Sequence, residues 1–228
     1  MAISVSKINS FDSCKLKYKL QYIDKVKQDE PHCFKKGKEA HKKLENISES
    51  SESFKTLKVL EKYKDVILNG KREEKIGLKV LNGTVVPCDF KDSDAFFHGI
   101  IDVLGDGYLL DYKTGKSKSF KEQDWTQLMY YSAWYFLKNP DYKTVTIAYL
   151  YVDHDTENAI ILSRDHLNEV LKKMLKKVIE ITKYEGNPTD EHTCNWQCEY
   201  CTVKQYCQHF QSLKGLEKIE FETIDLEV

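Results

Sequence analysis

Residues 99–116 read GIIDVLGDGYLLDYKTGK, and this stretch predicts the centre of the fold. Asp106-Gly107 is a strong signal for a two-residue hairpin turn, and β-forming residues flank it on both sides. A turn at these two positions places Asp102 directly opposite Asp111. Residues opposed in this way have Cβ atoms about 4.5–5.5 Å apart on one face of the sheet. The sequence therefore predicts two carboxylates side by side near the end of a hairpin.

Lys113 lies two residues beyond Asp111, so its side chain is expected on the same face. Two like charges opposed on a largely apolar hairpin are destabilising unless something compensates them. A divalent cation between Asp102 and Asp111 would do so, since Mg²⁺ prefers carboxylate oxygens. This trio fits metal-assisted phosphodiester cleavage. An exposed edge hairpin with solvated acids is the alternative, and the three residues alone do not decide between the two.

The pattern around this hairpin is that of a mixed α/β protein. Helices are expected where apolar residues recur every three or four positions, and strands where β-forming residues cluster. The expected helices cover residues 6–23, 34–47, 54–66, 121–137 and 163–184. The expected strands lie within residues 73–114, 144–152 and 158–162. No internal repeat or linker interrupts the pattern, so we expect a single domain over residues 1–228, with an acidic tail at 215–228.

The formal net charge of −1 hides an uneven distribution of charge. Residues 1–43 hold eleven lysines against five acidic residues, and residues 112–143 hold six lysines against three. Residues 217–228 hold five acidic residues and one lysine. Basic segments of this kind are typical of a surface that binds phosphates. They are equally typical of solvated helices, so charge alone does not identify a nucleic-acid-binding protein.

The longest apolar run is only a few residues, whereas a membrane span needs about 20. The opening MAISVSKINSF has no apolar region of the kind found in signal peptides, so we expect a cytoplasmic protein with no membrane partner. Four of the seven cysteines crowd into CNWQCEYCTVKQYC, residues 194–207. In a reducing compartment such a cluster favours a metal over disulfides. A Zn²⁺ site could use all four, and a [4Fe–4S] cluster could use three of them with a distant thiolate.

Several short motifs follow one another in a recognisable order. They are SVSKINSFDSCKLKY (4–18), GKEAH ending at His41, GIIDV containing Asp102, DYKTG containing Asp111 and Lys113, QLMYY containing Gln127 and Tyr131, and the terminal cysteines. Together they resemble the RecB-like branch of the PD-(D/E)XK nucleases over nearly the whole chain. The resemblance implies a restriction-endonuclease-like core, in which helices flank a central mixed sheet.

The resemblance also implies a role for each motif residue. His41, Asp102 and Asp111 would bind Mg²⁺ or Mn²⁺ together with the backbone carbonyl of Tyr112. Asp111 and Lys113 would form the D-x-K core of the catalytic site. The remaining catalytic candidates are Asp102, Gln127 and Tyr131, the last two orienting substrate and lysine. Glu73 and Glu74 lie where relatives carry an acidic residue.

In the iron–sulfur-containing members of this branch, one early cysteine joins three terminal ones. That pattern implies a [4Fe–4S] cluster on Cys14, Cys198, Cys201 and Cys207, which would bind the terminal segment to the fold. Cys194 departs from the pattern, and it could replace Cys14 as a ligand or lie outside the cluster. The Zn²⁺ alternative stays open.

We therefore expect a metal-dependent DNA exonuclease acting on DNA ends or single strands, similar to CRISPR-adaptation and phage or recombination exonucleases. Its partners would be DNA and the proteins of such a system. No G-x-x-x-x-G-K-[ST] motif occurs, so no nucleotide-driven motor is expected. Two alternatives remain: a structure-specific or nicking endonuclease on the same scaffold, and a non-catalytic DNA-binding adaptor with a zinc site.

Overall fold

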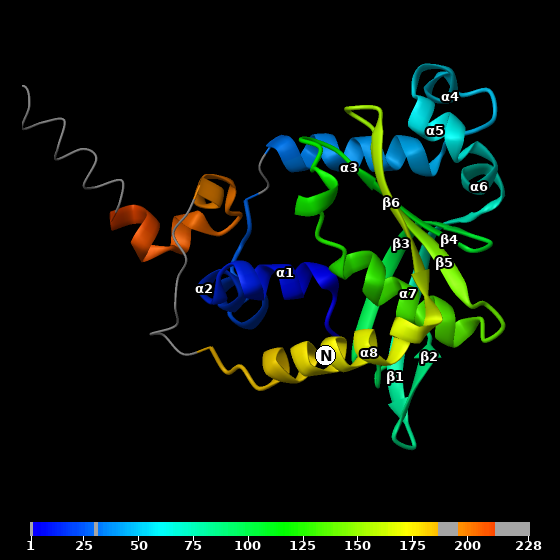
Figure 1. Cartoon of the computed structure of the whole chain (residues 1–228). Coiled ribbons are helices and arrows are strands. Elements are labelled where there is room, and N and C mark those ends of the chain that lie inside the picture. Colours follow the sequence, from blue (N-terminus) through cyan, green and yellow to red (C-terminus); the bar gives the residue numbers. More distant parts are fainter. Residues whose placement is uncertain (1, 30–31, 187–195, 213–228) are drawn as a thin grey trace, which may run out of the picture. The chain divides into compact units, whose positions relative to one another are not determined.

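The computed structural model describes residues 2–29, 32–186 and 196–212 (Figure 1). The chain forms two compact units. The first, here the sheet unit, comprises Met1–Val5 and Lys36–Glu180. The second, here the terminal unit, comprises Ser6–Lys35 and Ile181–Val228. Cys194 and the acidic tail at 215–228 lie outside the described residues, so the predictions that concern them are not addressed by the structure.

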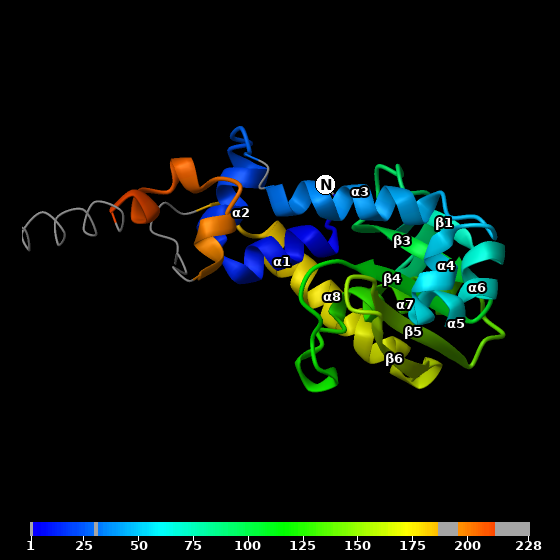
Figure 2. The same ribbon diagram turned by 90° about the horizontal axis from the view of Figure 1, so that it is seen from above.

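Six strands form one sheet in the order β2-β1-β3-β4-β5-β6. The strands are β1 (Lys71–Leu81), β2 (Thr84–Cys88), β3 (Phe97–Gly105), β4 (Tyr108–Lys113), β5 (Thr144–Tyr151) and β6 (Thr156–Ser163). The β4–β5 pair is parallel and the other pairs are antiparallel, so the sheet is mixed. Helices flank it (Figures 1 and 2), which confirms the predicted α/β architecture.

The β3–β4 hairpin has the predicted register. Its pairs are Gly105 with Tyr108, Leu104 with Leu109, and Val103 with Leu110. This ladder ends one position before Asp102 and Asp111 would pair. There the backbone N–H of Tyr112 donates instead to Asp102 Oδ2, at 2.7 Å. A carboxylate thus satisfies a backbone donor, and Asp102 is tied to the neighbouring strand.

The sheet unit contains six helices among the described residues. They are α3 (His32–Glu45), α4 (Glu52–Thr56), α5 (Lys58–Lys62), α6 (Lys64–Asn69), α7 (Thr126–Lys138) and α8 (Leu167–Thr182). The helix predicted over residues 54–66 is three short helices instead. The helix predicted from residue 121 begins at Thr126. Residues Phe120–Glu122 form a separate 3₁₀ turn, closed by a capping box between Ser119 and Glu122.

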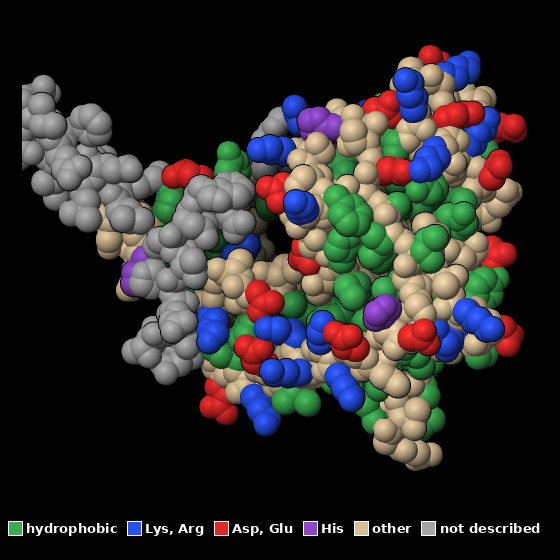
Figure 3. Space-filling view, in the orientation of Figure 1, with side chains coloured by type: hydrophobic (Ala, Val, Ile, Leu, Met, Phe, Trp, Pro, Cys, Tyr) green, Lys and Arg blue, Asp and Glu red, His purple; other side chains and the backbone are tan. Residues whose placement is uncertain are grey.

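Helix α7 is more deeply buried than its pattern predicts. Its buried residues are Leu128, Tyr130, Tyr131, Ser132, Ala133, Trp134, Tyr135 and Phe136. Helix α8, by contrast, is amphipathic, with Val170, Met174 and Val178 buried. Its outer face interleaves lysines with acidic residues (Figure 3), and Lys173 lies 2.7 Å from Glu169. The lysines of α8 therefore belong to a solvated surface of mixed charge.

In the terminal unit, the helix predicted over residues 6–23 is interrupted at Cys14. The segments are α1 (Val5–Ser13), α2 (Lys15–Tyr18) and a π-helical turn (Lys19–Ile23). Cys14 has extended backbone angles (φ −168°, ψ 114°), and its Sγ accepts a hydrogen bond from the Lys17 N–H at 3.4 Å. The thiol thus caps the second segment, which explains why the apolar periodicity continues through the break.

Two 3₁₀ turns, Trp196–Tyr200 and Lys204–Tyr206, make up the described part of the cysteine segment. The Gln21 side chain donates to Thr202 Oγ1 at 2.7 Å, and the Asp29 N–H donates to the Thr202 carbonyl at 2.8 Å. Residues near the two ends of the chain are thus joined within the terminal unit. None of the described helices has the length and apolar character needed to cross a bilayer.

Candidate active site

Three of the predicted side chains form one contact network between β4 and α7. Gln127 Nε2 donates to Asp111 Oδ1 at 2.5 Å, and Gln127 Oε1 accepts from Lys113 Nζ at 3.1 Å. Lys113 Nζ also lies 2.6 Å from Asp111 Oδ2. One amide therefore bridges the carboxylate and the ammonium. The structure brings together the two residues of the D-x-K motif and the glutamine of the QLMYY motif.

Asp111 is buried, with 2% of its surface exposed. Its Oδ2 has the ionic contact with Lys113 but no hydrogen-bond partner among the described residues. Burial raises the pKa of Asp111 to about 6, and the charge of Asp102 acts in the same direction. Lys113 and His41 partly oppose this rise. Asp111 is therefore a carboxylate that the protein holds at a cost, short of the donors that would stabilise its charge.

His41 reaches the same place from α3. Its Nδ1 lies 3.3 Å from Asp102 Oδ2, and this contact raises the pKa of His41. Gly37 stands one turn earlier on the helix. A Cβ there would lie only 3.2 Å from Thr114 Oγ1, so a glycine allows α3 to pass close to the end of β4. The spacing of the GKEAH motif thus has a structural basis beside its histidine.

Tyr131 lies in the core, 5% exposed, with its ring over Gly99. A Cβ at Gly99 would be 2.4 Å from Tyr131 Cε1, so the ring occupies the space that any side chain there would need. Burial raises the pKa of Tyr131, with a further contribution from the charge of Asp111, while Gln127 acts in the opposite direction. Tyr131 is therefore placed to support the network from below, out of contact with solvent.

The motifs did not identify Tyr149. This residue pairs with Asp111 across the parallel β4–β5 ladder. Its buried ring lies 5.0 Å from Lys113 Nζ, in a cation–π contact. Lys113 is thus held by a carboxylate, an amide and an aromatic ring. The only sequence signal was the apolar run of residues 144–152, which predicts a buried strand but not its partner.

Of the two acidic candidates on β1, Glu73 is the one near the site. Its neighbours Arg72 and Glu74 pair with Val103 and Ile101, so Glu73 falls opposite Asp102. Burial raises the pKa of Glu73, and Asp102 adds to that rise. Glu73 also has a positive φ of 51°, a conformation that costs a non-glycine residue free energy. Glu74 instead lies 3.8 Å from Lys71.

Within the described ranges, no group of three or more His, Cys, Asp and Glu side chains stands in a metal-binding arrangement. The donors near Asp111 nevertheless suit a divalent cation in their chemistry. Asp102 and Asp111 supply carboxylate oxygens, one of them buried without a hydrogen-bond partner among the described residues, and His41 supplies an imidazole. A hard cation would give Asp111 Oδ2 the positive charge that its burial lacks.

The described cysteines of the predicted cluster lie in the terminal unit. Burial raises the pKa of the Cys201 thiol, and Cys14 and Cys198 add to that rise, which indicates that these three thiols lie near one another. Cys207 follows the second 3₁₀ turn, where its N–H donates to the Lys204 carbonyl at 3.1 Å. The choice between Cys14 and Cys194 as a ligand stays open.

The sequence profile of the PD-(D/E)XK nuclease superfamily matches residues 2–208. No curated protein matches the chain. A crystal structure described as that of SSO0001 is similar, with a TM-score of 0.48 and 17% sequence identity over 91% of this chain and 86% of that chain. That likeness is too low to carry an argument, and the profile match decides the family. The chain belongs to the PD-(D/E)XK nuclease superfamily, which implies a metal-dependent nuclease acting on DNA.

Proposed function

We propose that the protein is a Mg²⁺- or Mn²⁺-dependent DNA exonuclease of the RecB-like branch, acting at DNA ends or in single strands. The observation that carries this proposal is the Gln127 bridge between Asp111 and Lys113, with Asp102 and His41 beside it. A non-catalytic adaptor has no use for a buried carboxylate with a raised pKa held against a lysine. Perturbed groups of this kind are typical of catalytic sites.

The ion would be held by His41, Asp102, Asp111 and the backbone carbonyl of Tyr112. When bound, it would polarise the scissile phosphate and acidify the attacking water. Lys113 remains about one-third exposed, so its ammonium reaches solvent and can meet a phosphate oxygen. Its role is to neutralise negative charge that develops in the transition state.

The other residues position this lysine and its carboxylates. Gln127 holds Lys113 and Asp111 in one orientation, because its amide nitrogen and oxygen each have a single suitable partner. Asp102 is fixed by the Tyr112 N–H, and Tyr131 supports α7 from below. We infer that these contacts keep Lys113 aligned with the substrate phosphate.

We also propose a structural [4Fe–4S] cluster on Cys14, Cys198, Cys201 and Cys207. The proximity of Cys14, Cys198 and Cys201 supports it, as do the hydrogen bonds that join both ends of the chain in the terminal unit. Anaerobically purified protein should be brown and absorb near about 400 nm. A colourless protein with stoichiometric zinc would instead support a Zn²⁺ site.

The proposed setting is the cytoplasm, with DNA as substrate and the proteins of a recombination, phage or CRISPR-adaptation system as partners. An endonuclease that nicks or recognises particular structures is the second candidate, since the same catalytic residues serve both reactions. The two activities differ in whether they need a DNA end.

The test compares linear duplex, single-stranded linear and covalently closed circular DNA, each with Mg²⁺, Mn²⁺ or a chelator. We expect mononucleotides or short products from the linear DNA, no reaction with the closed circle, and no reaction in the chelator. Cleavage of the closed circle would favour the endonuclease. Equal cleavage with and without the chelator would contradict metal dependence.

A further inference from the structure

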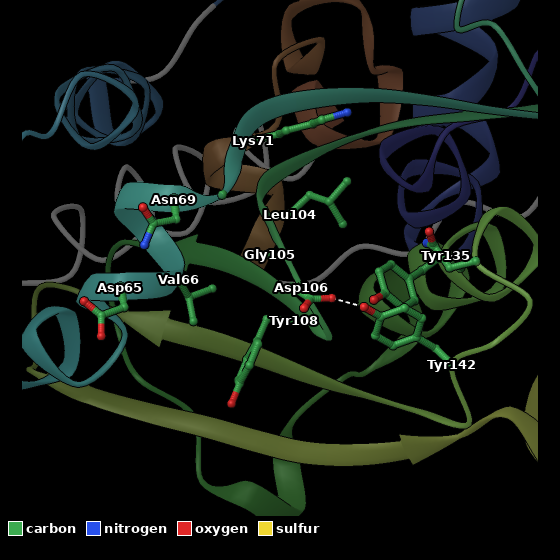
Figure 4. A pocket seen from close by; sticks show the side chains of 12 residues that line it. Asp65, Val66, Asn69, Lys71, Leu104, Gly105, Asp106, Tyr108, Tyr135 and Tyr142 are labelled. Carbon is green, nitrogen blue, oxygen red and sulfur yellow. Dashed lines mark hydrogen bonds between the residues drawn. The ribbon is translucent and has the colours of Figure 1, made fainter.

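A hollow of about 520 Å³ lies at the turn end of the β3–β4 hairpin (Figure 4). Asp65 and Asn69 of α6 line one side of it, and Tyr135 and Tyr142 line the other. Between them lie Leu104, Gly105, Asp106 and Tyr108 of the hairpin. Its volume is within the range of small-ligand sites, about 300–1,000 Å³.

This hollow is separate from the candidate active site. Gly105 is three residues along β3 from Asp102, and Tyr108 is three residues along β4 from Asp111. At about 3.3 Å per strand residue, the two places are about 10 Å apart. None of the proposed catalytic residues lines the hollow.

The charges that line the hollow favour a cation. Asp65 is exposed and makes no hydrogen bond or ion pair with any described residue. Asp106 accepts a hydrogen bond from the Tyr142 hydroxyl through one oxygen, which leaves the other oxygen for a ligand. Lys71 is the lining residue of opposite charge, and its ammonium lies 3.8 Å from Glu74. Two carboxylates against one paired lysine would repel a phosphate and attract a positive group.

Aromatic rings form the rest of the wall. Tyr135 and Tyr142 meet edge to face, with ring centroids 5.5 Å apart. The Tyr135 hydroxyl accepts a hydrogen bond from the Gly107 N–H at 2.9 Å, so this ring is anchored to the hairpin turn. Tyr108 adds a third ring. Tyrosine faces attract ammonium and guanidinium groups, and they do so more strongly where water is partly excluded.

We propose that this hollow binds an organic cation, a guanidinium or ammonium group, between Asp65 and Asp106 and against the tyrosine rings. The Asn69 amide offers a further acceptor at the same wall. A guanidinium has five donors in one plane, which suits two separated carboxylates and an amide. The cation could be a free small molecule or an arginine or lysine side chain of another protein, because both present the same chemistry.

The test is a titration followed by the backbone amide NMR signals of Gly105, Gly107 and Tyr108. The probes are agmatine, the tripeptide Gly-Arg-Gly, and the same peptide with citrulline, which replaces the charged guanidinium by a neutral group of similar shape. We expect saturable shifts with agmatine or Gly-Arg-Gly, and none with the citrulline peptide. Shifts with agmatine indicate a free cation, whereas shifts with the peptide alone indicate a protein side chain.

Asp65→Asn with Asp106→Asn should weaken the binding at least tenfold, because it removes both charges. Asn-Gly is as good a hairpin turn as Asp-Gly, so the fold is expected to persist. Asp141→Asn is the matched control, since this exposed aspartate lies near Tyr142 in sequence but outside the lining, and it should leave the affinity unchanged. Equal affinity in the double variant, or binding of deoxyguanosine in place of the cations, would overturn the proposal.

Discussion

Asp111→Asn is predicted to stabilise the metal-free protein. The pKa of Asp111 is raised from 3.8 to about 6, because the buried carboxylate is poorly compensated. At about 1.4 kcal/mol per pKa unit, that rise corresponds to about 3 kcal/mol of lost stability above pH 7. Asparagine removes this penalty and can keep the bond from Gln127, but it loses the ionic contact with Lys113. Allowing about 1 kcal/mol for that loss leaves a net gain of about 2 kcal/mol.

The direction of the pH dependence follows from the raised pKa. The folded protein binds the Asp111 proton more tightly than the unfolded chain, so this contribution lowers stability as pH rises from about 4 through about 6. Asp111→Asn should lack that fall. The assay is thermal unfolding between pH 5 and pH 8 in a chelator, where about 2 kcal/mol corresponds to a Tm higher by roughly 4–8 °C for a domain of this size.

The exposed Asp141→Asn serves as control and should leave Tm within about 1 °C. Adding Mg²⁺ should raise the Tm of the wild-type protein and have little effect on Asp111→Asn, because a bound ligand stabilises the folded state. The reasoning fails if Asp111→Asn is less stable than the wild type at pH 8 in the chelator. It fails equally if Mg²⁺ stabilises both proteins to the same extent.

Three further predictions concern single contacts. Gln127→Leu removes hydrogen bonds to two charged groups, so kcat for DNA cleavage should fall by about 10- to 100-fold, as measured on linear DNA in saturating Mg²⁺; an unchanged kcat would contradict the positioning role. Gly99→Ala forces a Cβ to within 2.4 Å of Tyr131 and should destabilise the fold by about 1–3 kcal/mol in urea unfolding, whereas an unchanged midpoint would show that the ring moves aside freely. Cys14→Ala should lower bound iron per chain, while Cys194→Ala should not; the reverse pattern would make Cys194 the fourth ligand.

The centre of the fold was predictable because its signals are local. Asp106-Gly107 selects a hairpin turn, and that turn alone sets the register that places Asp102 and Asp111 together. The alternation of strand side chains then places Lys113 beside Asp111, and helical spacing places Gln127 and Tyr131 on one face of α7. Each step depends on a few neighbouring residues.

The remaining contacts depend on long-range pairing, which sequence patterns do not report. Tyr149 meets Lys113 because β5 lies parallel to β4, and the pattern of a buried strand does not name its neighbour. Glu73 faces Asp102 through a positive φ that local preference disfavours. The break at Cys14 was missed because the thiol caps the second segment without disturbing the apolar periodicity.

The central claim is that Lys113, held by Asp111 and Gln127, assists metal-dependent cleavage of DNA. The most direct test measures nucleotide release from end-labelled linear DNA by wild-type protein and Lys113→Ala, with Mg²⁺ and with a chelator. We predict Mg²⁺-dependent release by the wild type and a reduction of at least about 100-fold in Lys113→Ala, with the same thermal unfolding profile in outline. Full Mg²⁺-dependent activity in a folded Lys113→Ala protein would contradict the proposed site.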